Sequence, residues 1–239
     1  MDPKHLYLDL MKRCVTNMIY GRTEPKFDAL KRANGWDWPV TAHTMIGMKR
    51  MDNIQACFER VIEDGVEGDL IETGVWRGGA VIFMRALLAA YGITNRRIWC
   101  ADSFEGLPVP NPQKYPADSG DSHHTQEFLP VGLEEVKANF AAYGLLDDQV
   151  KFLEGWFEDT LPSAPISKLC ICRLDGDMYG STIVALESLY PKLSTGGFLI
   201  VDDWTLPGAR KAVEDYRAKN GILDPILPID RHSTYWRKS

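Results

Sequence analysis

Four aspartates in the second half of the chain could together hold a cation and move a proton. Asp175 and Asp177 stand in "RLDGDMYGS", directly after an apolar run, and Asp202 and Asp203 stand in "IVDDW". Carboxylates beside a buried strand are costly unless a partner offsets their charge. One helix-length segment separates Asp175 from Asp202, 27 positions later, so their strands can be neighbours. Asp175, Asp202 and Asp203 can then meet at one edge of a sheet.

These acids favour a metal site with a separate base. Three carboxylates at close range repel one another, and a divalent cation relieves that repulsion. A set of oxygen ligands with no His or Cys nearby suits Mg²⁺, or Ca²⁺ in its place. We expect Asp175, Asp202 and Asp203 as metal ligands. Asp177, two residues past Asp175, is expected to be the general base that deprotonates an acceptor hydroxyl.

Two of these assignments have competitors in the sequence. Asp203 precedes "TLPGARKAVEDY" and could cap the helix that this stretch predicts. His123 and His124 could supply the base, since an unperturbed imidazole titrates near neutral pH.

A glycine-rich turn, "ETGVWRGGA" from Glu72 to Ala80, joins a predicted strand to a predicted helix. The turn is typical of a nucleotide-like ligand, but it departs from the dinucleotide pattern G-x-G-x-x-G. Trp76 stands where a small residue must let a pyrophosphate approach the backbone. Asp102 follows Gly79 by 23 residues, close to the spacing of an acid that binds a ribose. A nucleoside without a pyrophosphate fits this pattern, and S-adenosylmethionine is such a ligand.

The elements that must position these residues alternate between strand and helix. Apolar strands are predicted at 69–74, 96–103, 150–155, 168–177 and 196–204, and helices at 80–92, 132–145, 181–193 and 208–221. Such alternation predicts an α/β, doubly wound, mostly parallel sheet. The tail 225–239 is expected to close it as an antiparallel hairpin.

The alternation of strands and helices begins near residue 65, and this boundary separates two expected domains. Helices are predicted at 5–20 and 44–64, with a loop at 21–43, so residues 1–64 are expected to form an N-terminal helical cap or lid. Residues 65–239 are expected to form the core. Within the core, 103–131 lacks periodicity and contains five prolines. We interpret so long a loop as a lid on the substrate side.

The amino-acid composition argues against several classes of binding partner. The 239 residues carry a formal net charge of −6, which argues against nucleic acid or an anionic membrane as a partner. The N-terminus lacks the apolar stretch of a signal peptide, so a cytoplasmic location is expected. The five cysteines form no C-x-x-C pair, which argues against a zinc site.

In their order, several motifs resemble the TylF-like family of macrocin O-methyltransferases. The matching stretches are "HTMIGMKRMDNIQ", "IETGVWRGGAVIFMRALLAAYG", "WCADSFEGLPVP", "LEGWFEDTLP", "RLDGDMYGST", "LYPKLSTGGFLIVDDW" and "ARKAVEDYR". Together they span most of residues 43–217. The resemblance implies a class I methyltransferase (Rossmann-like) fold, S-adenosylmethionine and Mg²⁺, with Asp175, Asp202 and Asp203 at the metal and Asp177 as base.

The resemblance also implies a cofactor site and an acceptor. The residues expected on the cofactor side are Met45, Glu72, Thr73, Gly74, Val75, Trp76, Asp102, Ser103, Phe104, Gly155, Trp156 and Asp175. The expected acceptor is a hydroxylated small molecule, a glycoside, methylated on a deoxysugar of a natural product such as an antibiotic. The alternatives are a catechol-type metal-dependent O-methyltransferase and a non-catalytic S-adenosylmethionine-binding protein. A homo-oligomer is expected.

Overall fold

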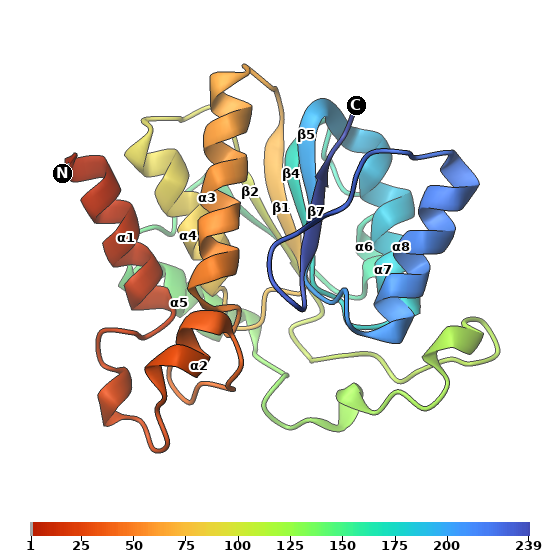
Figure 1. The fold of residues 1–239 in the computed structure, drawn as a ribbon, viewed down its shortest axis with the longest axis horizontal. Coiled ribbons are helices and arrows are strands. Elements are labelled where there is room, and N and C mark those ends of the chain that lie inside the picture. The colour runs from red at the N-terminus through yellow and green to blue at the C-terminus, as the bar shows by residue number, and fades with distance from the viewer. Residues whose placement is uncertain (1) are drawn as a thin grey trace.

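A seven-stranded mixed sheet forms the centre of the molecule (Figure 1). The computed structural model describes residues 2–239, so Met1, the first residue of the expected cap, lies outside the described residues. The strands, in the spatial order β3-β2-β1-β4-β5-β7-β6, are β1 (Asp69–Thr73), β2 (Ile98–Asp102), β3 (Val150–Glu154), β4 (Leu169–Leu174), β5 (Leu193–Val201), β6 (Leu227–Pro228) and β7 (Thr234–Arg237). The first five pair in parallel, and β7 pairs antiparallel with both β5 and β6.

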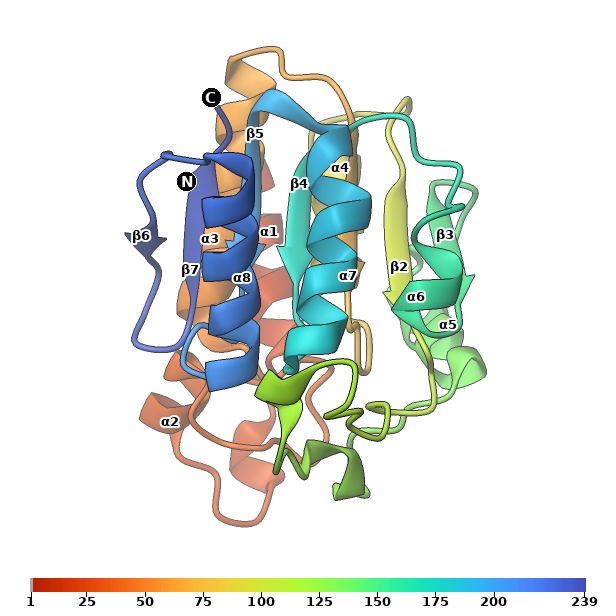
Figure 2. The ribbon, with the colours of Figure 1, turned by 90° about the vertical axis from the view of Figure 1, so that its right-hand side faces the viewer.

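Helices cover both faces of the sheet, as Figures 1 and 2 show. One face packs against α1 (Pro3–Val15), α3 (Gly47–Glu63), α4 (Gly79–Ala90) and α5 (Leu133–Ala142). The other face packs against α6 (Phe157–Thr160), α7 (Tyr179–Leu189) and α8 (Pro207–Asn220). The central strands β1, β2, β4 and the second half of β5 are almost wholly buried, as expected for a parallel sheet that is covered on both sides.

The order of the strands reverses between β1 and β4. From β1 the chain proceeds outward to β2 and β3, and then returns to pair β4 with the other edge of β1. Ligands of open α/β sheets bind at this switch, beyond the carboxyl ends of the strands. Glu72 on β1 lies in register with Arg173 on β4, and their side chains pair near that end.

The expected doubly wound fold and the closing antiparallel hairpin are confirmed. The expected loop 21–43 is wrong in part, because it contains α2 (Ala29–Asn34) and a short 3₁₀ turn, Gly21–Thr23. The first helix also ends at Val15, earlier than expected. The helices of the expected cap share the core of the sheet: α1 and α3 pack on α4, and α3 also contacts β4 and β5.

No helix within residues 2–239 combines the length and the apolar character needed to cross a bilayer.

Candidate active site

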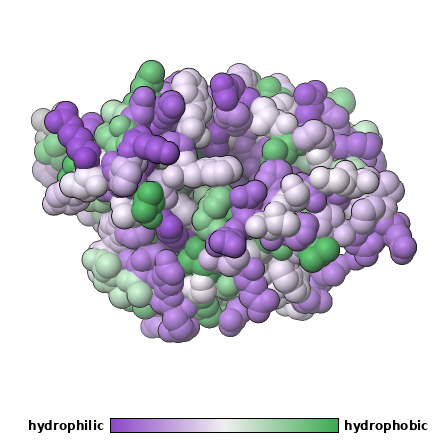
Figure 3. Space-filling model, turned by 90° about the horizontal axis from the view of Figure 1, so that it is seen from below, coloured by the Kyte–Doolittle hydropathy of each residue, from purple (hydrophilic) through white to green (hydrophobic). Residues whose placement is uncertain are grey.

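A cavity of about 820 Å³ opens at the carboxyl ends of the strands. Its lining comes from residues 35–50, the glycine-rich turn after β1, the loop 103–131, the segments that follow β3, β4 and β5, and the turn between β6 and β7. Figure 1 shows these segments gathered below the sheet, and Figure 3 shows that face of the molecule. The cavity therefore lies where the strand order predicts a ligand.

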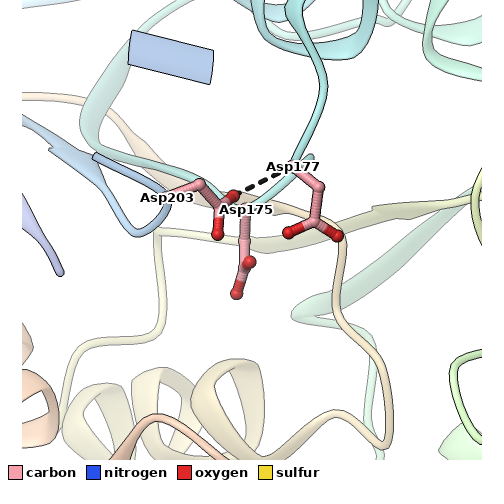
Figure 4. Close-up of side chains that lie close together, drawn as sticks. All are labelled: Asp175, Asp177 and Asp203. Atoms are coloured by element: carbon pink, nitrogen blue, oxygen red, sulfur yellow. Dashed lines mark hydrogen bonds between the residues drawn. The ribbon is translucent and has the colours of Figure 1, made fainter. Parts of the chain in front are cut away.

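Three aspartates at the floor of the cavity lie close together (Figure 4). Asp175, Asp177 and Asp203 each offer a carboxylate oxygen, and the three oxygens lie within 4.8 Å of one another. Asp177 has a left-handed backbone with φ 58°, and its N–H donates to the Asp203 carboxylate at 2.9 Å. This curl of the chain brings Asp177 back beside Asp175.

The structure differs from the expected metal set at Asp202. Its carboxylate accepts from the Arg50 guanidinium at 2.6 Å, from Arg173 and from the Ser233 hydroxyl. Both oxygens therefore already have cationic partners, and Asp177, rather than Asp202, completes the group of three oxygens. Direct contact between Asp202 and a metal stays a prediction.

A fully buried arginine connects the acids below the cavity. Arg173 is 0% exposed and pairs with Glu72, Asp202 and Asp175, the last at 2.7 Å. Arg50, from α3, bridges Asp202 and Asp230. One Glu72 oxygen and the Arg173 Nε are buried without a hydrogen-bond partner among the described residues. The cluster carries more carboxylates than guanidinium groups, so its negative charge is only partly offset.

Burial and mutual repulsion perturb these carboxylates. Burial, together with the charge of Asp202, raises the pKa of Asp175 well above its ordinary value. Burial and neighbouring Asp175 raise the pKa of Asp177 to about 7, and burial and Asp177 raise that of Asp203. Burial alone would raise the pKa of Asp202 too, but Arg173 and Arg50 lower it. Clustered carboxylate oxygens with excess negative charge are the donor set that hard divalent cations prefer, so the residues fit such an ion.

The glycine-rich turn lies beside these acids. Gly74 has φ 82°, and a Cβ there would overlap the carbonyl oxygen of Asp175, so only glycine fits. The Asp102 carboxylate holds the turn by accepting the N–H of Val75 at 2.7 Å and that of Phe104 at 2.8 Å. Asp102 thus lines the cavity and also shapes the loop that follows β1.

Nearly the whole chain matches known proteins of one family. The model of "Macrocin-O-methyltransferase (TylF)" matches residues 10–238. The chain belongs to this family. It is 54% identical to the 8-demethyl-8-(2,3-dimethoxy-alpha-L-rhamnosyl)-tetracenomycin-C 4′-O-methyltransferase of Streptomyces olivaceus, over 99% of this chain and 94% of that protein. It is 50% identical to the mycinamicin III 3″-O-methyltransferase of Micromonospora griseorubida, over 98% of this chain and 96% of that protein.

Solved structures agree with this assignment. The O-methyltransferase NovP is 46% identical, covers 99% of both chains and has a TM-score of 0.91. The calicheamicin methyltransferase CalS11 shares the fold, with a TM-score of 0.65 and 21% identity. The match covers 99% of this chain and 93% of CalS11. The resemblance read from the motifs is confirmed, and this member of the macrocin O-methyltransferase family is an S-adenosylmethionine-dependent O-methyltransferase.

Most of the residues expected on the cofactor side line the cavity of this macrocin-type enzyme. They are Met45, Glu72, Gly74, Val75, Trp76, Asp102, Ser103, Trp156 and Asp175. Thr73, Phe104 and Gly155 are not among the lining residues. Thr73 is 1% exposed, and its carbonyl accepts the N–H of Asp175 at 2.9 Å. Its place is therefore in the sheet that supports the site.

The two histidines that compete for the role of base are placed differently. His123 lines the cavity, and its Nδ1 lies 2.9 Å from the Asp121 carboxylate. His124 is not among the lining residues. Neither belongs to the group of three oxygens at the floor.

Sequence reasoning missed several residues that this family member uses to build the site. Arg173 carried a signal, because an arginine within the apolar strand "LCICRL" needs buried partners. Arg50 and Asp230 gave none, since they meet across 180 residues. Asp118, within the expected lid, is 2% exposed. Its carboxylate accepts the first two N–H groups of α7, at 2.6 and 2.9 Å.

Proposed function

We propose that the protein transfers a methyl group from S-adenosylmethionine to a hydroxyl of a deoxysugar on a glycosylated natural product. The observation that carries this proposal is the group of acids at the floor of the cavity, next to the glycine-rich turn. The relatives support the acceptor class. One is named for a rhamnosyl-tetracenomycin, one for mycinamicin III and one, from Streptomyces niveus, for demethyldecarbamoylnovobiocin.

Asp177 is the base in this proposal. It lines the cavity beside Asp175 and Asp203. It accepts the proton of the acceptor hydroxyl as that oxygen bonds to the methyl carbon and the carbon–sulfur bond breaks, leaving S-adenosylhomocysteine. No covalent bond to the protein forms, so the residues contribute mainly by positioning and electrostatics.

Asp175, Asp202 and Asp203 are the proposed ligands of Mg²⁺, or of Ca²⁺ in its place. When bound, the cation offsets the carboxylates and polarises a hydroxyl beside it. Asp202 is the ligand that needs a test, because two guanidinium groups contact it. We expect Asp202→Asn to weaken Mg²⁺ binding more than Asp177→Asn does, as measured by calorimetric titration. The reverse order would make Asp177 the third ligand.

Methyl transfer itself tests the proposal. We expect S-adenosylhomocysteine to bind in a calorimetric titration, and Mg²⁺ to be required for transfer of labelled methyl to deoxysugar glycosides. Asp177→Asn should lower kcat by at least ~100-fold, the usual scale of a positioned base, with little change in cofactor affinity. Asp148→Asn, at an exposed position, is the control. Absence of cofactor binding would reject the proposal, and full activity of Asp177→Asn would move the base to His123.

The expected homo-oligomer and the expected cytoplasmic location stay predictions.

A further inference from the structure

Exposed aromatic and apolar residues lie at the mouth of the cavity. Trp36, Trp38 and Val109 are 44%, 68% and 75% exposed, and all three line the cavity together with Phe128. We call these four residues the aromatic rim. Figure 3 shows apolar residues set among polar ones on this face. Exposed apolar surface around a binding cleft marks an interaction site.

The rim comes from two segments that meet across the mouth. Trp36 and Trp38 follow α2, whereas Val109 and Phe128 belong to the loop 103–131. The rings of Trp38 and Phe128 lie 4.7 Å apart between centroids and are tilted by 39°. The Trp76 indole, in the glycine-rich turn, donates to the carbonyl of Phe128 at 2.9 Å. The rim is therefore continuous with the cofactor side of the cavity.

Polar contacts fix the backbone of the first segment. The buried Glu24 carboxylate accepts the N–H groups of Val40 and Thr41 and pairs with Arg32 at 2.6 Å. Arg32 also pairs with Asp37, between the two tryptophans, at 2.8 Å.

Arg77 fixes the same segment from the glycine-rich turn. Its guanidinium donates to the carbonyls of Pro39, Val40 and Ala42. The backbone that carries Trp38 is thus fixed by buried and charge-assisted hydrogen bonds. Because the indole is not needed to hold this backbone, its exposed face is free for a ligand.

The cavity therefore changes character from its floor to its mouth. Carboxylates line the floor, and aromatic rings line the mouth. We infer that the rim binds the aglycone of the acceptor, and that it fits a planar, apolar ring system that stacks on Trp38 while the sugar reaches the acids. Flat aromatic faces contact planar rings over a larger area than they contact branched aliphatic chains. This inference rests on the proposed function and adds the class of aglycone.

Three glycosides of one deoxysugar test the inference: a methyl glycoside, an octyl glycoside and a glycoside of a polycyclic aromatic phenol. We expect the KM of the aromatic glycoside to be the lowest of the three. Trp38→Ala should raise that KM roughly 3- to 10-fold, the scale of one aromatic contact, so that it approaches the KM of the methyl glycoside. Trp38→Phe should restore part of the difference. Leu223→Ala, at a position 93% exposed and outside the cavity lining, should keep it in full.

The outcomes separate the inference from the proposed function. Equal KM values for all three glycosides, or a KM difference that survives Trp38→Ala in a folded variant, would overturn the aglycone subsite. An octyl glycoside that binds as tightly as the aromatic one would reject the planar class. Absence of methyl transfer to any glycoside, despite binding of S-adenosylhomocysteine, would reject the proposed function and the inference with it. Circular dichroism and thermal melting establish that each variant is folded.

Discussion

Replacement of Arg173 by methionine tests whether the buried charge cluster holds the site together. The guanidinium is 0% exposed and pairs with Glu72, Asp175 and Asp202. Methionine fills a similar volume with an apolar, flexible chain. The substitution therefore removes the charge and the hydrogen bonds but leaves little space empty.

The expected loss of stability is large. Removing one partner of a buried ion pair costs about 3–5 kcal/mol, because the remaining charge stays buried without compensation. Arg50 still contacts Asp202 and limits the loss there. Glu72, 2% exposed, keeps no hydrogen-bond partner among the described residues. We therefore expect Arg173→Met to lower the free energy of unfolding by about 3 kcal/mol or more at pH 8.

The loss should depend on pH in a defined direction. Burial raises the pKa of Glu72 to about 7 and that of Asp175 well above its ordinary value, while Arg173 lowers both. In the variant, both folded-state pKa values should therefore rise further. A group with a raised folded pKa contributes stability at low pH, and that contribution is lost as the pH rises through the folded pKa. The deficit relative to the parent protein should therefore be largest at pH 8 and should shrink at pH 5.

Urea denaturation at pH 8 and pH 5, in the presence of a chelator, measures this deficit. Arg13→Met is the matched control, because Arg13 and Asp9 form an exposed pair one helical turn apart. Such pairs contribute about 0.3–0.5 kcal/mol. A deficit below 1 kcal/mol for Arg173→Met, or an equal deficit at both pH values, would refute the reasoning.

Three further predictions follow from single contacts. Asp118→Ala removes the cap of α7. The substitution should lower the free energy of unfolding, measured in urea, by about 1–2 kcal/mol. It should also speed proteolysis within residues 103–131. An unchanged cleavage rate would show that other contacts hold this loop. Asp177, with a pKa of about 7 against 3.8 unfolded, lowers the stability of the metal-free fold progressively between about pH 4 and pH 7, and the loss is complete above pH 7. Asp177→Asn should therefore raise the unfolding free energy by roughly 1–3 kcal/mol more at pH 8 than near pH 5; an equal gain at both pH values would contradict the shift. Gly74→Ala should weaken S-adenosylhomocysteine binding at least ~10-fold in calorimetry, because its Cβ overlaps Asp175. Gly92→Ala, with φ 64° and no atom within 4 Å, should bind normally.

The parallel part of the fold could be predicted from the sequence because each of its five strands contains a short apolar run that is followed by a turn or an acid. The helix α2 could not, because six residues within a stretch rich in Gly, Pro, Asn and Trp carry too little periodicity. Asp28 caps its first turn, and Gly35 takes the left-handed conformation at its end. Neither role can be recognised from the residue type alone. The sequence therefore predicts Trp36 and Trp38 only as part of the cap or lid 1–64, without a contact to the cavity.

The arginines of the site show a second limit. The sequence indicates which carboxylates stand at strand ends, but a buried carboxylate is compensated either by a cation or by a guanidinium. Arg50 lies 152 residues from Asp202 and meets it only through the packing of α3 on the sheet. No local pattern can assign that pair, so the expected metal set included Asp202 without its partners.

Asp177 shows why spacing alone could not place the group of three oxygens. In an extended strand, residues two apart share a face but lie about 7 Å apart, too far for one small site. The left-handed φ of 58° at Asp177 breaks that geometry. A non-glycine residue in this conformation costs about 1 kcal/mol or more, and here the hydrogen bond from its N–H to Asp203 offsets part of the cost. Strained residues cluster at active sites. We therefore infer that the turn keeps its strained conformation because it places the Asp177 carboxylate beside Asp175 and Asp203.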